Sequence, residues 1–271
     1  MNRRDFLSTA AATAAVTTSI TTVSTTSTAA ADAAAGGSAE YYELRRYHLR
    51  RGPRQRVFED YLKNAWLPAM GRQGIGPIGV FHVMLGPESP SLYTLVPYKS
   101  LDQLGSVSRR LREDGEYLKA AEEAASAPAG DPVYQRVESS LFVAFSGMPK
   151  LEVPRQAAEG KARLFELRIY ESHSRRANLK KIQMFNEGEI ALFRRTGLTP
   201  VFFGEAMVGA RLPNLTYMLV FDDLAARETA WRTFAGDPEW KRMSSAPGFT
   251  DPEIVTDISN VLLRPAGYSQ V

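Results

Sequence analysis

Two sets of three polar side chains stand at alternate positions of predicted strands, where they could bind a ligand. The sets are Glu43, Arg45, Tyr47 and Glu166, Arg168, Tyr170. A carboxylate two residues from a guanidinium on one strand face can form a hydrogen-bonded ion pair, and the tyrosine hydroxyl adds a further partner. Such a set could bind an anionic or oxygen-bearing molecule. Because buried charges persist mainly when they are paired, the sets could instead satisfy themselves and fix the register between two sheets.

Apart from Arg46, the residues between the set members are apolar, so each strand has one polar and one largely apolar face. Leu44 separates the members of the first set, and Phe165, Leu167 and Ile169 line the opposite face of the second. We expect the apolar faces to pack against helices. The Glu-Arg-Tyr sets should then face the interior of a barrel.

The two copies differ beside these sets. Arg46 and His48 stand where the second copy has isoleucine and glutamate, and His82 likewise replaces a glutamate. Histidine can act as a base or metal ligand near neutral pH, and two histidines with two glutamates could bind a divalent metal. The sequence has no His-x-x-x-His or His-x-x-Glu spacing, so we predict no metal site. A specialised site, if present, is expected near Arg46 and His48.

Both sets belong to an internal repeat with a shift of 123 positions (166 − 43). Glu-Leu-Arg-x-Tyr opens each copy, and the same shift relates Gly74 to Gly197 and Leu92 to Leu215. The register holds without a gap as far as Tyr117, which corresponds to a tryptophan. Two copies of one module that share a core explain this match.

Each module is predicted to run strand, helix, two strands, helix, strand. The expected strands are 41–49, 78–85, 92–98 and 133–145, then 163–171, 200–208, 215–221 and 253–263. An apolar stripe indicates a first helix that ends near Gly74, and a capping pattern at Ser100 and Gln103 begins a second helix expected to reach about residue 125. An acidic pair and an aromatic residue also recur; they are Asp114, Glu116, Tyr117 and Asp237, Glu239, Trp240. We predict a structural role for them, because Asp237-Pro238-Glu239 has the pattern of a helix start, and we expect the aromatic residue to pack on the sheet.

One such module forms a four-stranded antiparallel sheet with both helices on one face, the ferredoxin-like arrangement. Its other face and its edges need a cover, which a second module can provide. The predicted fold class is therefore α+β, with two tandem ferredoxin-like β-α-β-β-α-β modules packed sheet to sheet as an intrachain dimeric-type α/β barrel. The expected organisation is a leader at 1–38, a first module at 39–146, a linker at 147–160 and a second module at 161–271.

The first 38 residues have the pattern of a twin-arginine signal peptide. A weakly apolar run follows the motif, with Ala-x-Ala cleavage sites at 29–31 and 33–35; the motif residues are Arg3, Arg4, Phe6 and Leu7. The run has too few bulky residues for a spanning helix. We therefore expect export to the periplasm or cell exterior in folded form, with no membrane span in the mature chain.

Composition excludes several classes of function. The formal net charge is only +3 and basic residues do not alternate with aromatic ones, so we predict no nucleic-acid binding. The chain has no cysteine, which excludes disulfides, thiolate metal sites and iron–sulfur clusters. It also lacks a phosphate-binding glycine loop and a serine nucleophile elbow.

The repeated Glu-Leu-Arg-x-Tyr opening, the Gly-Ile-Gly-Pro-Ile-Gly-Val-Phe segment at 74–81 and the recurring Asp-x-Glu-aromatic pattern resemble the NIPSNAP family. The resemblance covers about Tyr41 to Arg264. It implies a dimeric α/β-barrel fold beside monooxygenase-like and haem-binding relatives, and it implies no established reaction.

From these observations we expect an exported protein that binds a small molecule or a protein partner. The alternative is a cofactor-light monooxygenase or isomerase with a sheet–helix pocket near Arg46 and His48. Haem binding would need a histidine on a helix, whereas the three histidines are predicted on strands or loops. No cofactor is predicted. Enzymatic activity, the ligand and assembly into homo-oligomers stay open.

Overall fold

The computed structural model describes residues 38–86 and 89–271. The predicted twin-arginine motif therefore lies outside the described residues. Within those residues, no helix has the length and apolar character needed to cross a membrane.

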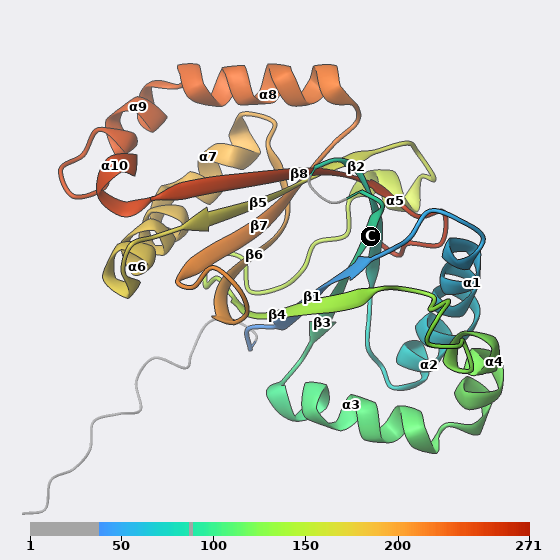
Figure 1. Ribbon diagram of the computed structural model, residues 1–271. Helices are drawn as coiled ribbons and strands as arrows, with labels where there is room; N and C mark the ends of the chain where they lie inside the picture. Colours follow the sequence, from blue (N-terminus) through green and yellow to red (C-terminus); the bar gives the residue numbers. More distant parts are fainter. Residues whose placement is uncertain (1–37, 87–88) are drawn as a thin grey trace, which may run out of the picture. The chain divides into compact units, whose positions relative to one another are not determined.

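Eight strands in the described part of the chain close into one antiparallel barrel (Figure 1). They are β1 (Tyr41–His48), β2 (Gly79–Leu85), β3 (Ser91–Tyr98), β4 (Arg136–Ala144), β5 (Leu164–Glu171), β6 (Thr199–Val208), β7 (Asn214–Phe221) and β8 (Asp257–Pro265). The first module has the strand order β4-β1-β3-β2, and the second has the matching order β8-β5-β7-β6. Pairing of β2 with β8 and of β4 with β6 joins the modules. The predicted intrachain barrel is confirmed.

The repeat keeps its register within the two sheets. Glu43 pairs with Val96 across β1 and β3, and Glu166 pairs with Leu219 across β5 and β7, at the same shift of 123. Closure of the barrel also needs a small residue at Gly204 on β6, because a Cβ there would lie 2.7 Å from the Cβ of Phe142 on β4.

Apolar side chains from both modules fill the barrel interior. Rings from the two modules meet there, with centroids 4.8 Å apart for Phe81 and Phe165 and 5.2 Å apart for Tyr42 and Phe202. Leu44 belongs to the same buried cluster. The predicted assignment of strand faces was wrong: the apolar faces line the barrel, so the Glu-Arg-Tyr sets face the helices. An enclosed interior excludes water and favours groups without hydrogen-bonding needs, whereas helix side chains can supply partners on the outer face.

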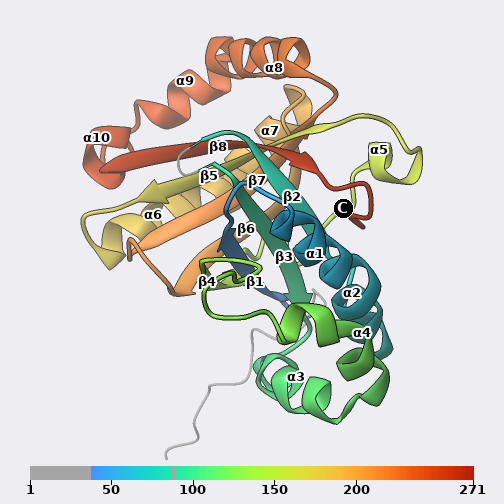
Figure 2. The same cartoon turned by 45° about the vertical axis from the view of Figure 1, so that its right-hand side comes forward.

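The helices cover the outer faces of the two sheets (Figure 2). The first module has α1 (Arg54–Tyr61), η1 (Leu62–Trp66), α2 (Leu67–Arg72), α3 (Leu101–Glu113) and α4 (Gly115–Ala125). The connection contains α5 (Arg155–Ala158), and the second module has α6 (Arg175–Met184), η2 (Phe185–Glu189), α7 (Ile190–Arg195), α8 (Leu224–Gly236), α9 (Pro238–Ser244) and α10 (Asp251–Ile254). The elements η1 and η2 are single π-helical turns at matching places of the repeat.

The helix predicted to run from about residue 100 to 125 is two helices. Asp114 interrupts it with an extended backbone, φ −86° and ψ 97°, and its carboxylate accepts a hydrogen bond from the Tyr117 backbone N–H at 2.9 Å. Asp237 caps α9 in the same way through the backbone N–H of Glu239. The recurring aspartates are therefore helix caps, because a side-chain oxygen there satisfies a free N–H of the first turn.

An arginine at the end of α2 or α7 ties each of these caps to the first helical segment of its module. In the first module Arg72 contacts Asp114 at 2.7 Å and Glu116 at 3.0 Å. In the second, Arg195 contacts Asp237 and Glu239, both at 2.9 Å. This confirms the structural interpretation of the recurring acids. The aromatic residues that follow pack on helices and not on the sheet as expected; Tyr117 contacts Tyr61, and Trp240 contacts Phe234.

Candidate functional site

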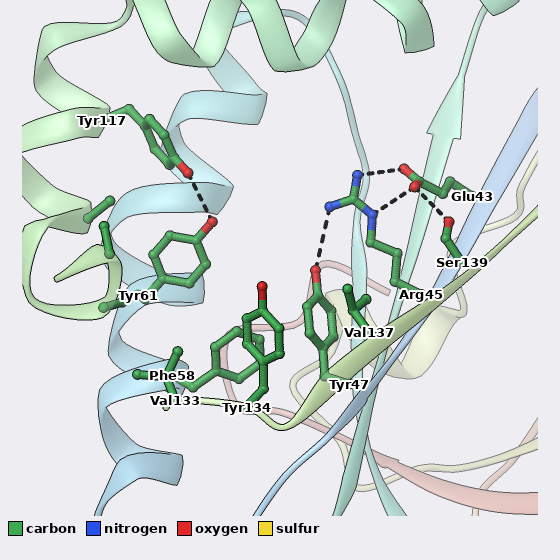
Figure 3. A pocket seen from close by; sticks show the side chains of 13 residues that line it. Glu43, Arg45, Tyr47, Phe58, Tyr61, Tyr117, Val133, Tyr134, Val137 and Ser139 are labelled. Carbon is green, nitrogen blue, oxygen red and sulfur yellow. Dashed lines mark hydrogen bonds and ion pairs between the residues drawn. The ribbon is translucent and has the colours of Figure 1, made fainter. Parts of the chain in front are cut away.

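A pocket of about 480 Å³ opens between the sheet of the first module and its helices (Figure 3). Strands β1 and β4, helices α1 and α4 and the loop before β4 contribute its walls. The lining residues are Glu43, Arg45, Tyr47, Phe58, Tyr61, Tyr117, Ala121, Ala124, Ala125, Val133, Tyr134, Val137 and Ser139. The first Glu-Arg-Tyr set is therefore part of a pocket, although on the face opposite to the predicted one.

The sheet wall holds a buried ion pair whose hydrogen bonds are largely used within the protein. Arg45 donates from Nε and Nη2 to the two carboxylate oxygens of Glu43, at 2.8 and 2.9 Å. The same carboxylate accepts hydrogen bonds from Ser139 at 2.8 Å and from Tyr98 at 3.1 Å. Arg45 Nη1 lies 3.5 Å from the hydroxyl of Tyr47.

Both members of this pair keep their charge. Burial by itself raises the pKa of Glu43, but the hydrogen bonds and charge of Arg45, with the hydroxyls of Ser139 and Tyr98, more than offset burial and lower it. Burial by itself lowers the pKa of Arg45, and the contacts with Glu43 and Tyr47 more than offset that effect and raise it. The wall is thus polar, yet it carries no net charge.

Aromatic rings form the helix side and the floor of the pocket in the view of Figure 3. The centroids of Tyr47 and Phe58 are 4.8 Å apart, and Tyr134 lies 5.4 Å from each of them. The hydroxyls of Tyr61 and Tyr117 share a hydrogen bond of 3.0 Å. Burial first, and the neighbouring Tyr117 second, raise the pKa of Tyr61, so this hydroxyl stays neutral.

Small side chains on α4 provide the space. Ala121, Ala124 and Ala125 line the pocket and lie on one face of the helix at spacings of three and four residues. The neighbouring Ala120 is exposed and is absent from the lining. A larger residue at Ala124 would therefore project into the pocket.

The second module has a buried ion pair at positions that are aromatic in the first. The shift of 123 places Lys181 at the position of Phe58 and Glu189 at that of Trp66. Lys181 Nζ lies 3.1 Å from Glu189 Oε2, and both residues are 1% exposed. The ammonium also lies 5.1 to 5.7 Å from the ring centroids of three aromatic residues, Tyr170, Phe185 and Trp240. Burial lowers the pKa of Lys181, but the charge of Glu189 more than offsets it, so the pKa is raised.

Helix α8 covers the second Glu-Arg-Tyr set. Arg227 contacts both oxygens of Glu166, at 2.9 and 2.7 Å, and Trp231 donates its indole N–H to Glu166 at 2.8 Å. Arg168 bonds Glu166 at 2.9 Å and lies 4.5 Å from the Trp231 ring centroid. The first module has leucine and serine at the positions of Arg227 and Trp231. The second set is thus a closed structural network.

The residues that distinguish the first strand do not line this pocket. Arg46 faces the barrel interior and lines a separate cavity of about 310 Å³ at the barrel mouth, where its Nη1 lies 3.9 Å from Glu138. His48 is 5% exposed and its Nε2 lies 3.1 Å from the same glutamate. The predicted sheet–helix pocket near Arg46 and His48 was therefore wrong, because β1 turns them away from the helices.

His82 lies on the helix-facing side of its sheet, opposite to the side that bears His48. It lies on β2 with its Nε2 3.7 Å from Glu59 of α1, so the structure does not bring His48 and His82 together. Across residues 38–86 and 89–271, no group of three or more histidines and carboxylates is arranged to hold a metal ion.

Sequence reasoning missed most of the pocket. Phe58 and Tyr61 were assigned only to the apolar stripe of the first helix, and Tyr134 and Ser139 carried no signal of their own. The alanine pairs at 120–121 and 124–125 are the available signal, because small residues on a sheet-facing helix leave room against the sheet. The arginine that contacts the helix cap, Arg72, also has a signal in the sequence, since the shift of 123 relates it to Arg195.

Fold and pocket together define a class of protein, an α+β barrel built within one chain from two ferredoxin-like modules. The NIPSNAP family model matches residues 42–138 and 165–270, one segment in each module. The chain belongs to the NIPSNAP family. No curated protein matches its sequence.

Solved structures share this fold at low sequence identity. A candidate monooxygenase from Fusobacterium nucleatum is 8% identical, with a TM-score of 0.55 over 84% of this chain and 93% of its own. One from Lactobacillus acidophilus is also 8% identical, with a TM-score of 0.54 over 84% and 94%. An uncharacterised NIPSNAP-like domain protein from Burkholderia xenovorans is 20% identical, with a TM-score of 0.35 over 38% of this chain and 85% of its own. For the two candidate monooxygenases, at 8% identity, the likeness concerns the fold alone.

Proposed function

We propose that this chain is a small-molecule-binding protein whose ligand occupies the pocket of the first module. The observation that carries the proposal is the contrast between the modules. The first leaves about 480 Å³ open beside Glu43 and Arg45, whereas in the second Arg227 and Trp231 of α8 cover the equivalent Glu166 and Arg168.

The composition of the pocket suits a ligand. Small-molecule sites are typically concave, largely apolar and supplied with a few polar groups that fix orientation, with volumes of about 300 to 1,000 Å³. Here the rings of Phe58 and Tyr134 give apolar contact, and Arg45, Tyr61 and Tyr117 offer polar atoms. Binding of one ligand per chain follows.

The test compares two substitutions on one helix. Purified protein is titrated with naphthol, naphthoate and naphthylmethylammonium, which share a ring system and differ in charge. We expect at least one to bind with one site per chain, and Ala124→Phe to weaken its binding by about tenfold or more by filling the pocket. Ala120→Phe, at the exposed neighbouring position, should leave binding unchanged. Absence of binding by all three probes, or equal binding by the two variants, overturns the proposal.

The structure does not support the site that the monooxygenase or isomerase alternative requires. It required a sheet–helix pocket containing Arg46 and His48, and these residues lie on the other face of β1. The likeness to candidate monooxygenases, at 8% identity, concerns the fold only.

Export by the twin-arginine route is the second part of the proposal, and Arg3 and Arg4 with the following Phe and Leu carry it. Replacing both arginines by lysine should keep the protein in the cytoplasm, as measured by fractionation of the expressing cells. The same change at Arg50 and Arg51, an exposed pair on the first module, is the control and should leave export intact. Unchanged export of the Arg3→Lys, Arg4→Lys variant contradicts this route.

A further inference from the structure

We infer that the ligand of the first pocket is an uncharged, flat aromatic molecule that carries a hydroxyl or carbonyl oxygen. This inference rests on the proposed function and adds the chemical class. It excludes organic anions and organic cations as the preferred ligands. Three features of the two modules lead to it.

The first feature is that Glu43 and Arg45 already neutralise each other within the protein. Arg45 directs two of its N–H groups to Glu43, and Glu43 has two further donors, Ser139 and Tyr98. A ligand carboxylate on the remaining N–H groups of Arg45 would lie close to the like charge of Glu43, so strong binding requires displacement of Glu43, whose side chain is 12% exposed. Displacement would leave the largely buried carboxylate of Glu43 without its main partner, and the free-energy cost of that exceeds the gain from the new ion pair. The arginine that suggested an anionic ligand is thus already neutralised.

The second feature is the way in which this fold holds a cation. The second module places the Lys181 ammonium among three aromatic rings and against the carboxylate of Glu189. The first module retains aromatic residues in this region but has Phe58 and Trp66 at the positions of the lysine and the glutamate. The carboxylate of the pocket wall, Glu43, is already paired with Arg45, so it does not provide the uncompensated negative charge that a bound cation would need, and Arg45 would repel a cation.

The third feature is the combination of aromatic surface with hydroxyl groups. Aromatic rings favour the edges and faces of other rings, which a flat aromatic ligand offers to Tyr47, Phe58 and Tyr134. The single hydrogen bond between Tyr61 and Tyr117 uses one of their two hydroxyl protons. The other proton can be donated to a ligand oxygen. A hydroxyl or carbonyl on an aromatic ring meets both conditions.

The test uses the same three naphthalene probes in calorimetric titrations at neutral pH. Naphthol is neutral there, and we expect it to bind at least about tenfold more tightly than naphthoate or naphthylmethylammonium. If naphthoate or the ammonium compound binds as tightly as naphthol, the inferred class is wrong while the pocket itself stands. If none of the three binds, the proposed function fails, so the two failures are distinguishable.

Two variants test the cause of the selectivity. Glu43→Gln leaves Arg45 charged without its carboxylate, and should raise the affinity for naphthoate by about tenfold relative to wild type. Ser139→Ala removes one hydroxyl donor to Glu43 but keeps the ion pair, so the affinity for naphthoate should stay as low as in wild type. Equal naphthoate affinity in wild type and Glu43→Gln, with the circular dichroism of both unchanged, contradicts the neutralisation argument.

Discussion

The equivalent glutamates of the two modules each accept four hydrogen bonds, but from different elements. Glu43 is bound by Arg45, Tyr98 and Ser139, all from strands or strand ends, and the space above it stays open. Glu166 is bound by groups that include Arg227 and Trp231 of α8, and its side chain is 0% exposed. The donors on α8 close the second site, and their absence from α3 leaves the first one open.

The buried pair of Lys181 and Glu189 predicts an asymmetric response to substitution. Lys181→Met should lower the free energy of unfolding by about 3 to 5 kcal/mol, because it leaves a buried carboxylate without a partner. Lys181→Met combined with Glu189→Leu should recover most of that loss, since the surrounding rings can pack against apolar groups. Urea denaturation of the two variants measures the difference. Equal stability of the single and double variants would show that the ion pair is not coupled.

Glu166 predicts a loss of stability in acid. Burial by itself raises its pKa, but the contacts of Arg227, Arg168 and Trp231 more than offset burial and hold the pKa below the ordinary 4.5. A pKa lowered by folding stabilises the protein fully above that ordinary value, and the contribution disappears as the pH falls through the lower folded-state pKa. Glu166→Gln should therefore flatten the acid limb of stability against pH.

The same substitution should cost about 3 kcal/mol near neutral pH, because Arg168 and Arg227 lose their buried partner. Denaturant titrations across the acid range measure both effects. Glu228→Gln, at an exposed position of α8, is the control and should leave the curve close to wild type. A Glu166→Gln curve parallel to wild type below pH 4.5 would argue against this source of acid sensitivity.

At the scale of elements, the two arginine clamps hold the helices that carry the caps. Arg72 fixes the start of α4, whose alanines line the pocket, whereas Arg195 fixes the start of α9 in the second module. The clamps are alike, so the repeat supplies a pair of matched variants. Their consequences differ because only one of these helices bounds an open pocket.

Arg72→Ala should weaken probe binding several-fold while it lowers overall stability only slightly, because exposed ion pairs contribute little. Arg195→Ala should lower stability by a similar small amount and leave probe binding unchanged. Calorimetric titration and thermal melting of both variants provide the comparison. Equal loss of probe affinity in the two would mean that α4 is not the element that shapes the pocket.

The π-helical turns η1 and η2 show how one local distortion serves two purposes. Each turn ends with a residue buried toward the sheet, Trp66 in the first module and Glu189 in the second. Such turns insert an extra residue into a helix and are frequent at functional sites. Trp66 lies with its ring centroid 5.9 Å from the guanidinium of Arg45, and Glu189 pairs with Lys181. Both modules have the same distortion of the helix, but its last residue is a tryptophan near Arg45 in the first module and a glutamate paired with Lys181 in the second.

At the scale of the whole molecule, the modules depend on each other. The barrel core joins side chains from both, and β2–β8 and β4–β6 pairing leaves no open edge in the described barrel. A single module would expose its half of that core together with two strand edges, which is a template for association.

The first module alone, residues 39–146, should therefore form a dimer when it is expressed without the second. The two copies would pair β2 and β4 as the tandem modules do. Size-exclusion chromatography with light scattering gives the mass, and circular dichroism reports folding. A folded, monodisperse monomer would contradict the expected dependence. Addition of residues 161–271 should convert the dimer into a heterodimer of the two modules.

Much of the fold could be predicted from the chain, while less of the site could. The strands expected at 41–49, 78–85 and 92–98 lie within a residue or two of β1, β2 and β3, because alternation and turn residues are local signals. The break at Asp114 was missed, since the helical pattern continues on both sides of the cap. The pocket was predicted at the wrong residues, Arg46 and His48. A comparison of the two copies shows where their sequences differ, but it does not show on which face of the strand the differing side chains lie.

The sequence by itself determined the repeat, the order of the elements, the barrel class and the family, because a periodic pattern and a constant shift depend only on positions along the chain. Tertiary structure alone decided which strand face is interior and which Glu-Arg-Tyr set lines an open pocket. Alternation shows that two faces of β1 differ, but the residues packed against each face come from distant segments. Phe202 of β6 meets one face of β1, and Phe58 of α1 meets the other. The alanines of α4 then leave space beside Arg45, whereas Arg227 and Trp231 of α8 cover Glu166 and Arg168 in the second module.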